Sequence, residues 1–295
     1  MEISPAVNIT CRVESPPIVF HGPSEETVGA FFSGQLAIEV NEDVINIESL
    51  VAEFMLHIVY KRPFQSHCKE CQNNYIQLET WQLIRETKTL LRGTHFFPFS
   101  THLDGSQPTS TDTPVFSITY KFKAEAIVCH QLQGLQTIHT NEQPMATPST
   151  SSLRLKLVIP VKRCIQEPLY PSFPRQTFPP TGITAIASYI PTIYPTTTNT
   201  LHLKVDGLVS TAKGHSDAPR WMLRQVKWQL EENIKATVPA CERHHRGAHV
   251  IHGNIRGIFR DQARVIGEKE LQQGWKSIKT SPSGTIEVEI EFGLG

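Results

Sequence analysis

Two short motifs in this chain carry residue types that hold a metal ion. Cys68 and Cys71 are separated by two residues, which lets both thiolates reach one tetrahedral Zn²⁺. One such pair is half of a site, and Cys241 with His244 repeats the spacing late in the chain. Together the four residues predict a structural zinc site that joins two domains. The alternative is that they lie on two unrelated surface loops.

A second set of residues is basic and lies on segments that resemble β-strands. Residues 152–161 alternate apolar and polar side chains, which is typical of a strand with one solvent-facing side. We expect the set to line a concave surface that binds an acidic or phosphorylated tail through charge-assisted hydrogen bonds. The alternative is an ordinary solvated strand face. The predicted patch comprises Arg154, Lys156, Lys162, Arg163, Arg220 and Arg224.

Charge is distributed unevenly, although the formal net charge is zero. Residues 1–150 carry 9 Lys/Arg against 16 Asp/Glu, and residues 151–295 carry 19 against 12. The basic half can bind an acidic partner, or the two halves can attract each other through their opposite net charges. A nucleic-acid partner is not expected, because aromatic and basic residues do not interleave.

Motifs of catalysis and membrane insertion are missing from the sequence. It contains no nucleophile elbow, no phosphate-binding loop, no His-Glu-x-x-His and no dinucleotide fingerprint. We therefore do not expect an enzyme. No apolar stretch approaches the roughly 20 residues that span a bilayer, so membrane association is expected to be peripheral.

Alternation with a period of two recurs along the chain and predicts an all-β fold. The exception is residues 74–91, where apolar spacing favours one short helix. Five prolines in residues 165–182 indicate an extended linker. We expect a first domain over 1–165, a linker over 166–182 and a second domain over 183–295. The second domain has room for about five or six strands of typical length, so it is expected to be incomplete.

The aromatic segment that contains Gly93 and Pro98 is the most informative for the fold. Gly93 interrupts the preceding pattern, and Pro98 indicates a sheet edge or a bulge, because proline cannot donate to a central ladder. The sequence resembles fungal alpha-arrestins, the arrestin-related trafficking adaptors, of the type with Cys-x-x-Cys before this segment. The matching motifs, in order, are Phe20-His21-Gly22-Pro23, Phe32-Ser33-Gly34-Gln35-Leu36, Cys68-x-x-Cys71, Trp81, Arg92-Gly93-Thr94-His95-x-x-Pro98-Phe99-Ser100, Phe178-Pro179-Pro180-Thr181-Gly182, Arg220-Trp221-x-Leu223-Arg224, Trp228-x-Leu230-Glu231-Glu232 and Gly274-Trp275-Lys276-Ser277.

This resemblance implies two tandem arrestin-like, immunoglobulin-type β-sandwiches without catalytic activity. It also implies an adaptor that links plasma-membrane transporters to a HECT-type ubiquitin ligase for endocytosis. Such a protein is cytoplasmic and is recruited to the plasma membrane, endosomes or Golgi. The alternative is an arrestin-fold subunit of a cargo-sorting coat, similar to the arrestin-shaped component of retromer.

One element of these adaptors is missing from the sequence. WW domains of the ligase bind Pro-Pro-x-Tyr segments, and the sequence contains none. Pro168 and Tyr170 keep only Pro-x-Tyr within the proline-rich linker. These two residues are a candidate weak WW ligand, and the alternative is ordinary linker.

Overall fold

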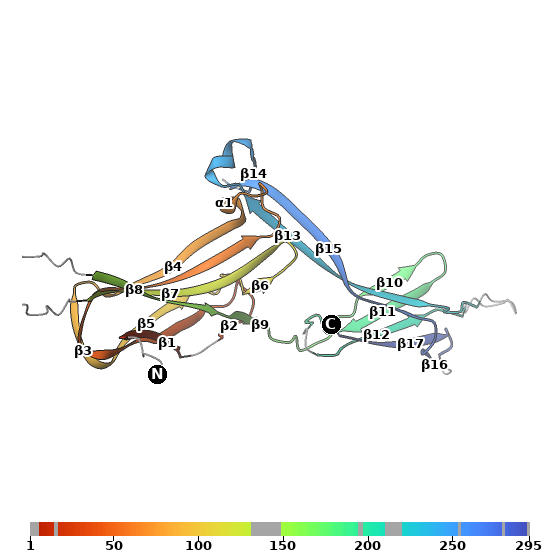
Figure 1. Cartoon of the computed structure of the whole chain (residues 1–295). Coiled ribbons are helices and arrows are strands. Elements are labelled where there is room, and N and C mark those ends of the chain that lie inside the picture. Colours follow the sequence, from red (N-terminus) through yellow and green to blue (C-terminus); the bar gives the residue numbers. More distant parts are fainter. Residues whose placement is uncertain are drawn as a thin grey trace, which may run out of the picture. The chain divides into compact units, whose positions relative to one another are not determined.

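The computed structural model describes residues 6–14, 17–130, 149–193, 197–209, 220–252, 255–278 and 281–293. It confirms the predicted all-β class (Figure 1). The described elements are β1 (Val7–Val13), β2 (Ile18–His21), β3 (Ala30–Tyr60), α1 (Lys69–Gln72), β4 (Asn73–Ile84), β5 (Lys88–Leu103), β6 (Thr111–Asp112), β7 (Phe116–His130), β8 (Ser149–Ile159), β9 (Val161–Cys164), β10 (Arg175–Phe178), β11 (Ile183–Tyr189), β12 (Asn199–Asp206), β13 (Val226–Pro239), η1 (Glu242–Gly247), β14 (His249–His252), β15 (Ile255–Leu271), β16 (Lys276–Ile278) and β17 (Thr285–Phe292). Within these residues, no helix is long and apolar enough to cross a membrane.

The chain forms two compact units, and each of them is discontinuous in sequence. The first combines Met1–Cys164 with Ala236–Arg260, and the second combines Ile165–Lys235 with Asp261–Gly295. An uninterrupted second domain over 183–295 is therefore not what the structure shows. The expected linker also differs, because it contains β10, which pairs with β11 in the second unit.

The first unit is organised around β3, which is 31 residues long and runs through two layers. Its residues 34–40 pair with β1, and residues 30–40 and 44–47 pair with β5. Residues 46–60 pair with β7 and, over residues 50–59, also with β4. The register shifts between Val40 and Val44, and Gly93 pairs with Val40 at the edge of this shift with a φ of +138°. Few side chains tolerate such a φ, so a glycine suits the position where the strands bend.

Alternating side chains of these strands point inward and form one aromatic core. The rings of Phe32 and Phe54, from the two parts of β3, stack with centroids 4.4 Å apart. Phe99 of β5 stacks on Phe122 of β7 at 4.7 Å, and Trp81 of β4 packs against both. The two parts of β3 thus face each other across the core, which is the arrangement of a β-sandwich.

Two local predictions had different outcomes. Pro98 lies in β5, which pairs only with β3 in the described part of the chain, so the predicted edge position is confirmed. The predicted helix over 74–91 is wrong, because this segment forms β4 and the start of β5. The described residues contain one α-helix, α1, which lies just before it and is four residues long.

The second unit contains a five-stranded sheet, in the order β10-β11-β12-β17-β16. Val226 and Trp228 of β13 pack against side chains of β17, among them Val288 and Phe292. Strand β13 begins at Val226, so the predicted patch residues Arg220 and Arg224 precede it.

Candidate metal centre

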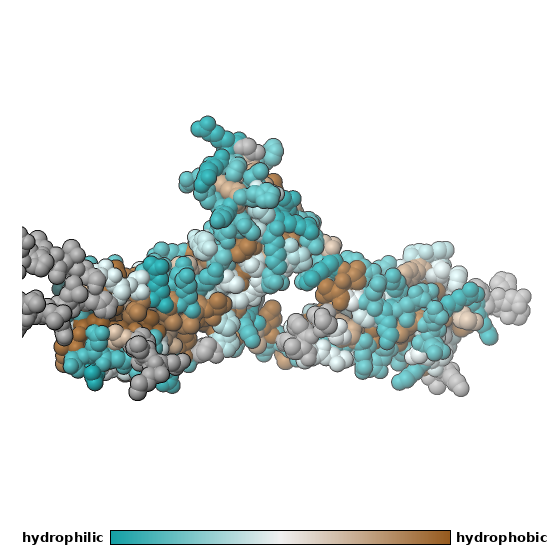
Figure 2. All heavy atoms as spheres, viewed as in Figure 1, coloured by the Kyte–Doolittle hydropathy of each residue, from teal (hydrophilic) through white to brown (hydrophobic). Residues whose placement is uncertain are grey.

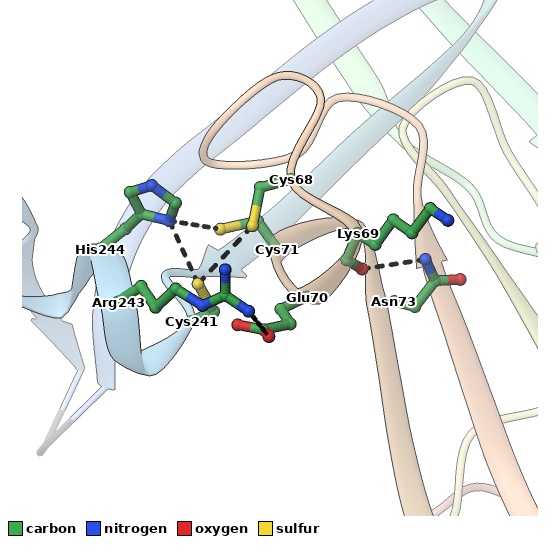
Figure 3. A network of polar contacts seen from close by, with 8 residues as sticks. All are labelled: Cys68, Lys69, Glu70, Cys71, Asn73, Cys241, Arg243 and His244. Carbon is green, nitrogen blue, oxygen red and sulfur yellow. Dashed lines mark hydrogen bonds and ion pairs between the residues drawn. The ribbon is translucent and has the colours of Figure 1, made fainter.

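The four predicted metal ligands lie together within the first unit. Their ligand atoms are all within 4.8 Å of one another, and Cys71 is buried while the other three are partly buried. Cys68 and Cys71 lie at α1, between β3 and β4, and Cys241 and His244 lie between β13 and β14 (Figure 3). The expectation that such a site would join two domains is wrong, because Ala236–Arg260 belongs to the first unit.

The cluster is held by contacts between sulfur atoms and by contacts of one imidazole nitrogen, Nδ1 of His244. The Sγ atoms of Cys68 and Cys241 are 3.8 Å apart. His244 directs its Nδ1 at two sulfurs, 3.4 Å from that of Cys71 and 3.1 Å from that of Cys241. All cysteines of the chain are free thiols. The arrangement thus offers three sulfur atoms and one nitrogen that converge on one point.

In each half of the cluster, the first of the two ligands is a cysteine that comes immediately before a short helical turn. Cys68 precedes α1 and Cys241 precedes η1. A hydrogen bond from the backbone amide of Cys71 lowers the pKa of Cys68. Desolvation, followed by the hydrogen bond with Cys71, raises the pKa of Cys241 to about 11.

A guanidinium and a carboxylate flank the sulfurs. Arg243 forms an ion pair with Glu70, which joins η1 to α1 (Figure 3). This pair, followed by the negative charges of Cys68 and Cys241, raises the pKa of Arg243. A hollow of about 550 Å³ opens beside the cluster, and its lining includes Glu70, Cys71, Cys241 and Arg243.

Helix α1, which follows Cys68 and contains Cys71, is tied to the sheet by a series of side-chain contacts. Asn73 donates from Nδ2 to the Lys69 carbonyl at 3.0 Å, and its Oδ1 lies 2.9 Å from Nε2 of His57. His57 is 6% exposed, stacks on Tyr75 at 4.2 Å and has the Lys121 ammonium 2.7 Å from its Nδ1. Since the ammonium donates to Nδ1, Nε2 carries the proton that is donated to Asn73. No local pattern in the sequence indicated this polar contact.

Stability should depend on the protonation of His57. Burial, followed by the charges of Lys121 and Lys123, lowers the pKa of His57. The unfolded chain therefore takes up the proton first, so the stabilisation is complete above the unfolded pKa of about 6.5 and is lost as pH falls from there through the lower folded pKa. We expect urea unfolding between about pH 7 and pH 5 to show a shallower pH dependence in His57→Gln than in the natural chain. Parallel curves would contradict this assignment.

The predicted basic patch is divided between the two units. The first unit contains Arg154, Lys156, Lys162 and Arg163, and the second contains the exposed Arg220 and Arg224. The structure therefore does not bring the six residues together as one patch within either unit.

Three of the first-unit residues lie on solvent-facing positions of β8 and β9. Arg154 forms an ion pair with Glu125 at 2.9 Å. Lys156 lies directly opposite Lys123 of β7, and Lys162 is exposed on β9. Neither Lys123, Lys156 nor Lys162 forms an ion pair within the described part of the chain.

The Arg163 side chain contacts backbone carbonyls and an aromatic ring of the first unit. Its guanidinium donates to the carbonyls of Gly22, Gly105 and Gln107 at 2.6–3.1 Å and lies 5.0 Å from the ring centroid of Phe20. These contacts use three of the five guanidinium N–H groups and hold the side chain against the backbone of the first unit. The prediction that Arg163 lines an open binding surface is therefore wrong.

Two further lysines of the first unit were not predicted as part of the patch. Lys121 and Lys123 lie on β7, and Lys123 is the cross-strand neighbour of Lys156. Alternation in residues 120–130 was the signal that could have identified them, because it places both lysines on one side of the strand.

The candidate WW ligand lies in a segment without regular structure, within the second unit. Tyr170 is 79% exposed and neighbouring Leu169 is 86% exposed. The side chain that a WW domain would contact is therefore open to solvent. The role of Pro168 and Tyr170 as a ligand stays a prediction.

Several fungal proteins are similar to this chain in sequence. An uncharacterized protein of Schizosaccharomyces pombe is 26% identical over 268 residues, and the match covers 91% of this chain and 63% of the relative. A second uncharacterized protein of that yeast is 28% identical over 298 residues, with 96% and 75% covered. Protein LDB19 of Eremothecium gossypii is 26% identical over 312 residues, with 98% and 41% covered. The chain thus spans less than two thirds of the length of the first and third of these relatives.

The family assignment comes from residues 50–248, which match the LDB19 family model, described as arrestin N-terminal like. This region covers more than half of the chain and contains all four candidate metal ligands. The expected arrestin relationship is confirmed, whereas the narrower subtype defined by Cys-x-x-Cys stays a prediction. The chain belongs to the LDB19 family of arrestin N-terminal-like proteins.

Proposed function

We propose that this chain is a non-catalytic adaptor that links plasma-membrane transporters to a HECT-type ubiquitin ligase for ubiquitin-dependent endocytosis. Membership of the LDB19 arrestin-like family is the observation that carries the proposal. Its setting is the cytoplasm, with recruitment through cargo to the plasma membrane, endosomes or Golgi. The sequence contains no nucleophile elbow, phosphate-binding loop or His-Glu-x-x-His, and a binding role requires none of them.

The outer face of β7 and β8 is the surface that best suits an acidic cargo tail. Lys123 and Lys156 are cross-strand neighbours, and like charges in that position repel. Lys121 adds a third ammonium, and its pKa is lowered by burial and then by Lys123 and Lys156. An acidic or phosphorylated segment would relieve this repulsion while gaining charge-assisted hydrogen bonds. A cavity of about 270 Å³ in this face is lined in part by Lys123, Arg154 and Lys156, and its lining also includes Glu53 and Glu125.

Charge reversal at this face should weaken cargo binding. We expect Lys123→Glu with Lys156→Glu to reduce the affinity for an acidic, phosphorylated peptide from a transporter tail by about tenfold or more, equivalent to about 1.4 kcal/mol. Fluorescence anisotropy at two salt concentrations measures the affinity and its salt dependence. Arg12→Glu with Arg85→Glu is the matched control, because both arginines are exposed and the charge change is equal. Equal affinities in the two variants would mean that Lys123 and Lys156 do not bind the peptide and are ordinary solvent-exposed side chains of the sheet.

The adaptor role itself is tested by reconstitution. The purified chain, a WW-domain HECT-type ligase and a transporter in liposomes are combined with ubiquitin and its activating and conjugating enzymes. We expect transporter ubiquitination to require the chain, and Tyr170→Ala to reduce it if Pro168 and Tyr170 form the WW ligand. Ubiquitination that is independent of the chain would contradict the adaptor role. Stable, stoichiometric co-purification with coat subunits would instead support the cargo-sorting alternative.

A further inference from the structure

The distances in the cysteine-histidine cluster match those of a tetrahedral metal site. Zinc–sulfur bonds of about 2.3 Å at tetrahedral angles place neighbouring sulfurs about 3.8 Å apart, and zinc–nitrogen bonds of about 2.0–2.1 Å place nitrogen about 3.5 Å from sulfur. The observed Cys68–Cys241 separation is 3.8 Å, and Nδ1 of His244 lies 3.4 and 3.1 Å from two sulfurs. A disulfide would need a sulfur separation of about 2.05 Å. The sulfurs of Cys68 and Cys241 are thus at the separation expected for two ligands of one metal ion, and they are too far apart for a disulfide bond.

The donor set also indicates which metal and which role. Three thiolates with one imidazole in a tetrahedral arrangement suit Zn²⁺, and four protein ligands leave no open position for a substrate. Three thiolates around one Zn²⁺ leave a net charge of −1, and the Arg243 guanidinium lies beside the cluster, where it forms an ion pair with Glu70 (Figure 3). The site therefore has the features of a closed structural centre.

Few apolar contacts hold the segment that supplies half of the ligands. Among the residues of Ala236–Arg260 whose burial is described, Val238 is the one hydrophobic side chain that is fully buried. The surface around α1 and β14 is largely hydrophilic (Figure 2). The remaining links to the body of the first unit include the Arg243–Glu70 ion pair and a 3.5 Å contact from Arg260 to the Pro63 carbonyl. Exposed ion pairs of this kind contribute little to stability.

We propose that Cys68, Cys71, Cys241 and His244 bind one Zn²⁺, which fastens the segment between β13 and β15 to α1 and β4 within the first unit. The metal takes the place of the hydrophobic core that this segment lacks. It joins two parts of the chain that are 173 residues apart in sequence. This proposal does not depend on the adaptor role.

Metal content of the purified full chain tests the binding. We expect one Zn²⁺ per chain by mass spectrometry of metals, and loss of most of it in Cys241→Ser and in His244→Ala. Cys164→Ser and His245→Ala are the matched controls, because both residues are exposed and lie outside the cluster. Replacement by Co²⁺ should give the visible absorption of a tetrahedral thiolate site. Substoichiometric zinc, equal zinc in all variants, or a Cys68–Cys241 disulfide would overturn the proposal.

Hydrogen exchange on the natural chain tests the fastening without relying on variants that fail to fold. We expect a chelator to increase exchange in residues 67–72 and 241–250, and added Zn²⁺ to restore protection. Peptides from β17 in the second unit serve as the internal reference and should not change. Unchanged exchange in both segments after complete metal removal would overturn the structural role.

Discussion

Replacement of Arg163 by methionine should destabilise the first unit by about 3 kcal/mol, a large effect for a residue that is not fully buried. The guanidinium donates to three carbonyls, those of Gly22, Gly105 and Gln107, and lies over the ring of Phe20. Each hydrogen bond to a charged group contributes about 1.5–3 kcal/mol, and the contributions are not additive. Methionine retains much of the apolar stem but leaves the carbonyls without this donor. Urea denaturation followed by hydrogen exchange of first-unit peptides measures the loss.

Two further variants distinguish the hydrogen-bond network from charge alone. Arg163→Lys keeps the charge, but one ammonium cannot reproduce the planar fork that reaches three carbonyls, so we expect it to recover only part of the stability. Lys162→Met removes a neighbouring exposed charge on the same strand and should change stability by no more than about 0.5 kcal/mol. A full rescue by lysine would show that the fork geometry is unimportant.

Arg163 also shows what the sequence could and could not predict. Its type and its position after an alternating strand indicated a basic residue available for binding. Two of its partners, Gly105 and Gln107, come from a loop more than fifty residues earlier, so nothing in the local sequence assigned it to them. Charge identifies a candidate ligand-binding residue, but only long-range geometry shows whether its donors are already occupied.

The four proposed zinc ligands were predictable for a different reason. Spacing of two residues within Cys68–Cys71 and within Cys241–His244 is a local property that follows from the size of a tetrahedral ion. Their convergence depends on Ala236–Arg260 packing within the first unit, whereas consecutive domains would place this segment in the second. The cluster was therefore predicted from local spacing, while its location in the fold was not.

The incorrectly predicted helix reflects competition between two patterns. Apolar residues such as Ile76, Trp81 and Ile84 have a spacing compatible with a helix, whereas Thr80 favours a strand. Pairing of β4 along residues 50–59 of β3 decides in favour of the strand. Tertiary pairing overrides local spacing here, as it often does for short amphipathic segments.

Truncation of Phe54 to alanine should destabilise the first unit by about 3–5 kcal/mol. Its ring is fully buried, stacks on Phe32 at 4.4 Å and lies 5.8 Å from Tyr120, so it links the two parts of β3 to β7. Alanine would lose this contact area and leave a cavity that rigid neighbouring strands cannot close. Urea denaturation with hydrogen exchange of β7 peptides measures the effect, and peptides of β17 report the second unit separately.

Phe31 of the same strand provides the matched control for Phe54. Its side chain is 72% exposed and touches His102 edge-on, so Phe31→Ala should cost no more than about 0.5–1 kcal/mol. The two variants remove the same atoms from the same strand and differ in the side of the sheet they face. Similar losses in both would contradict the inward and outward assignment of β3, on which the sandwich core of the first unit depends.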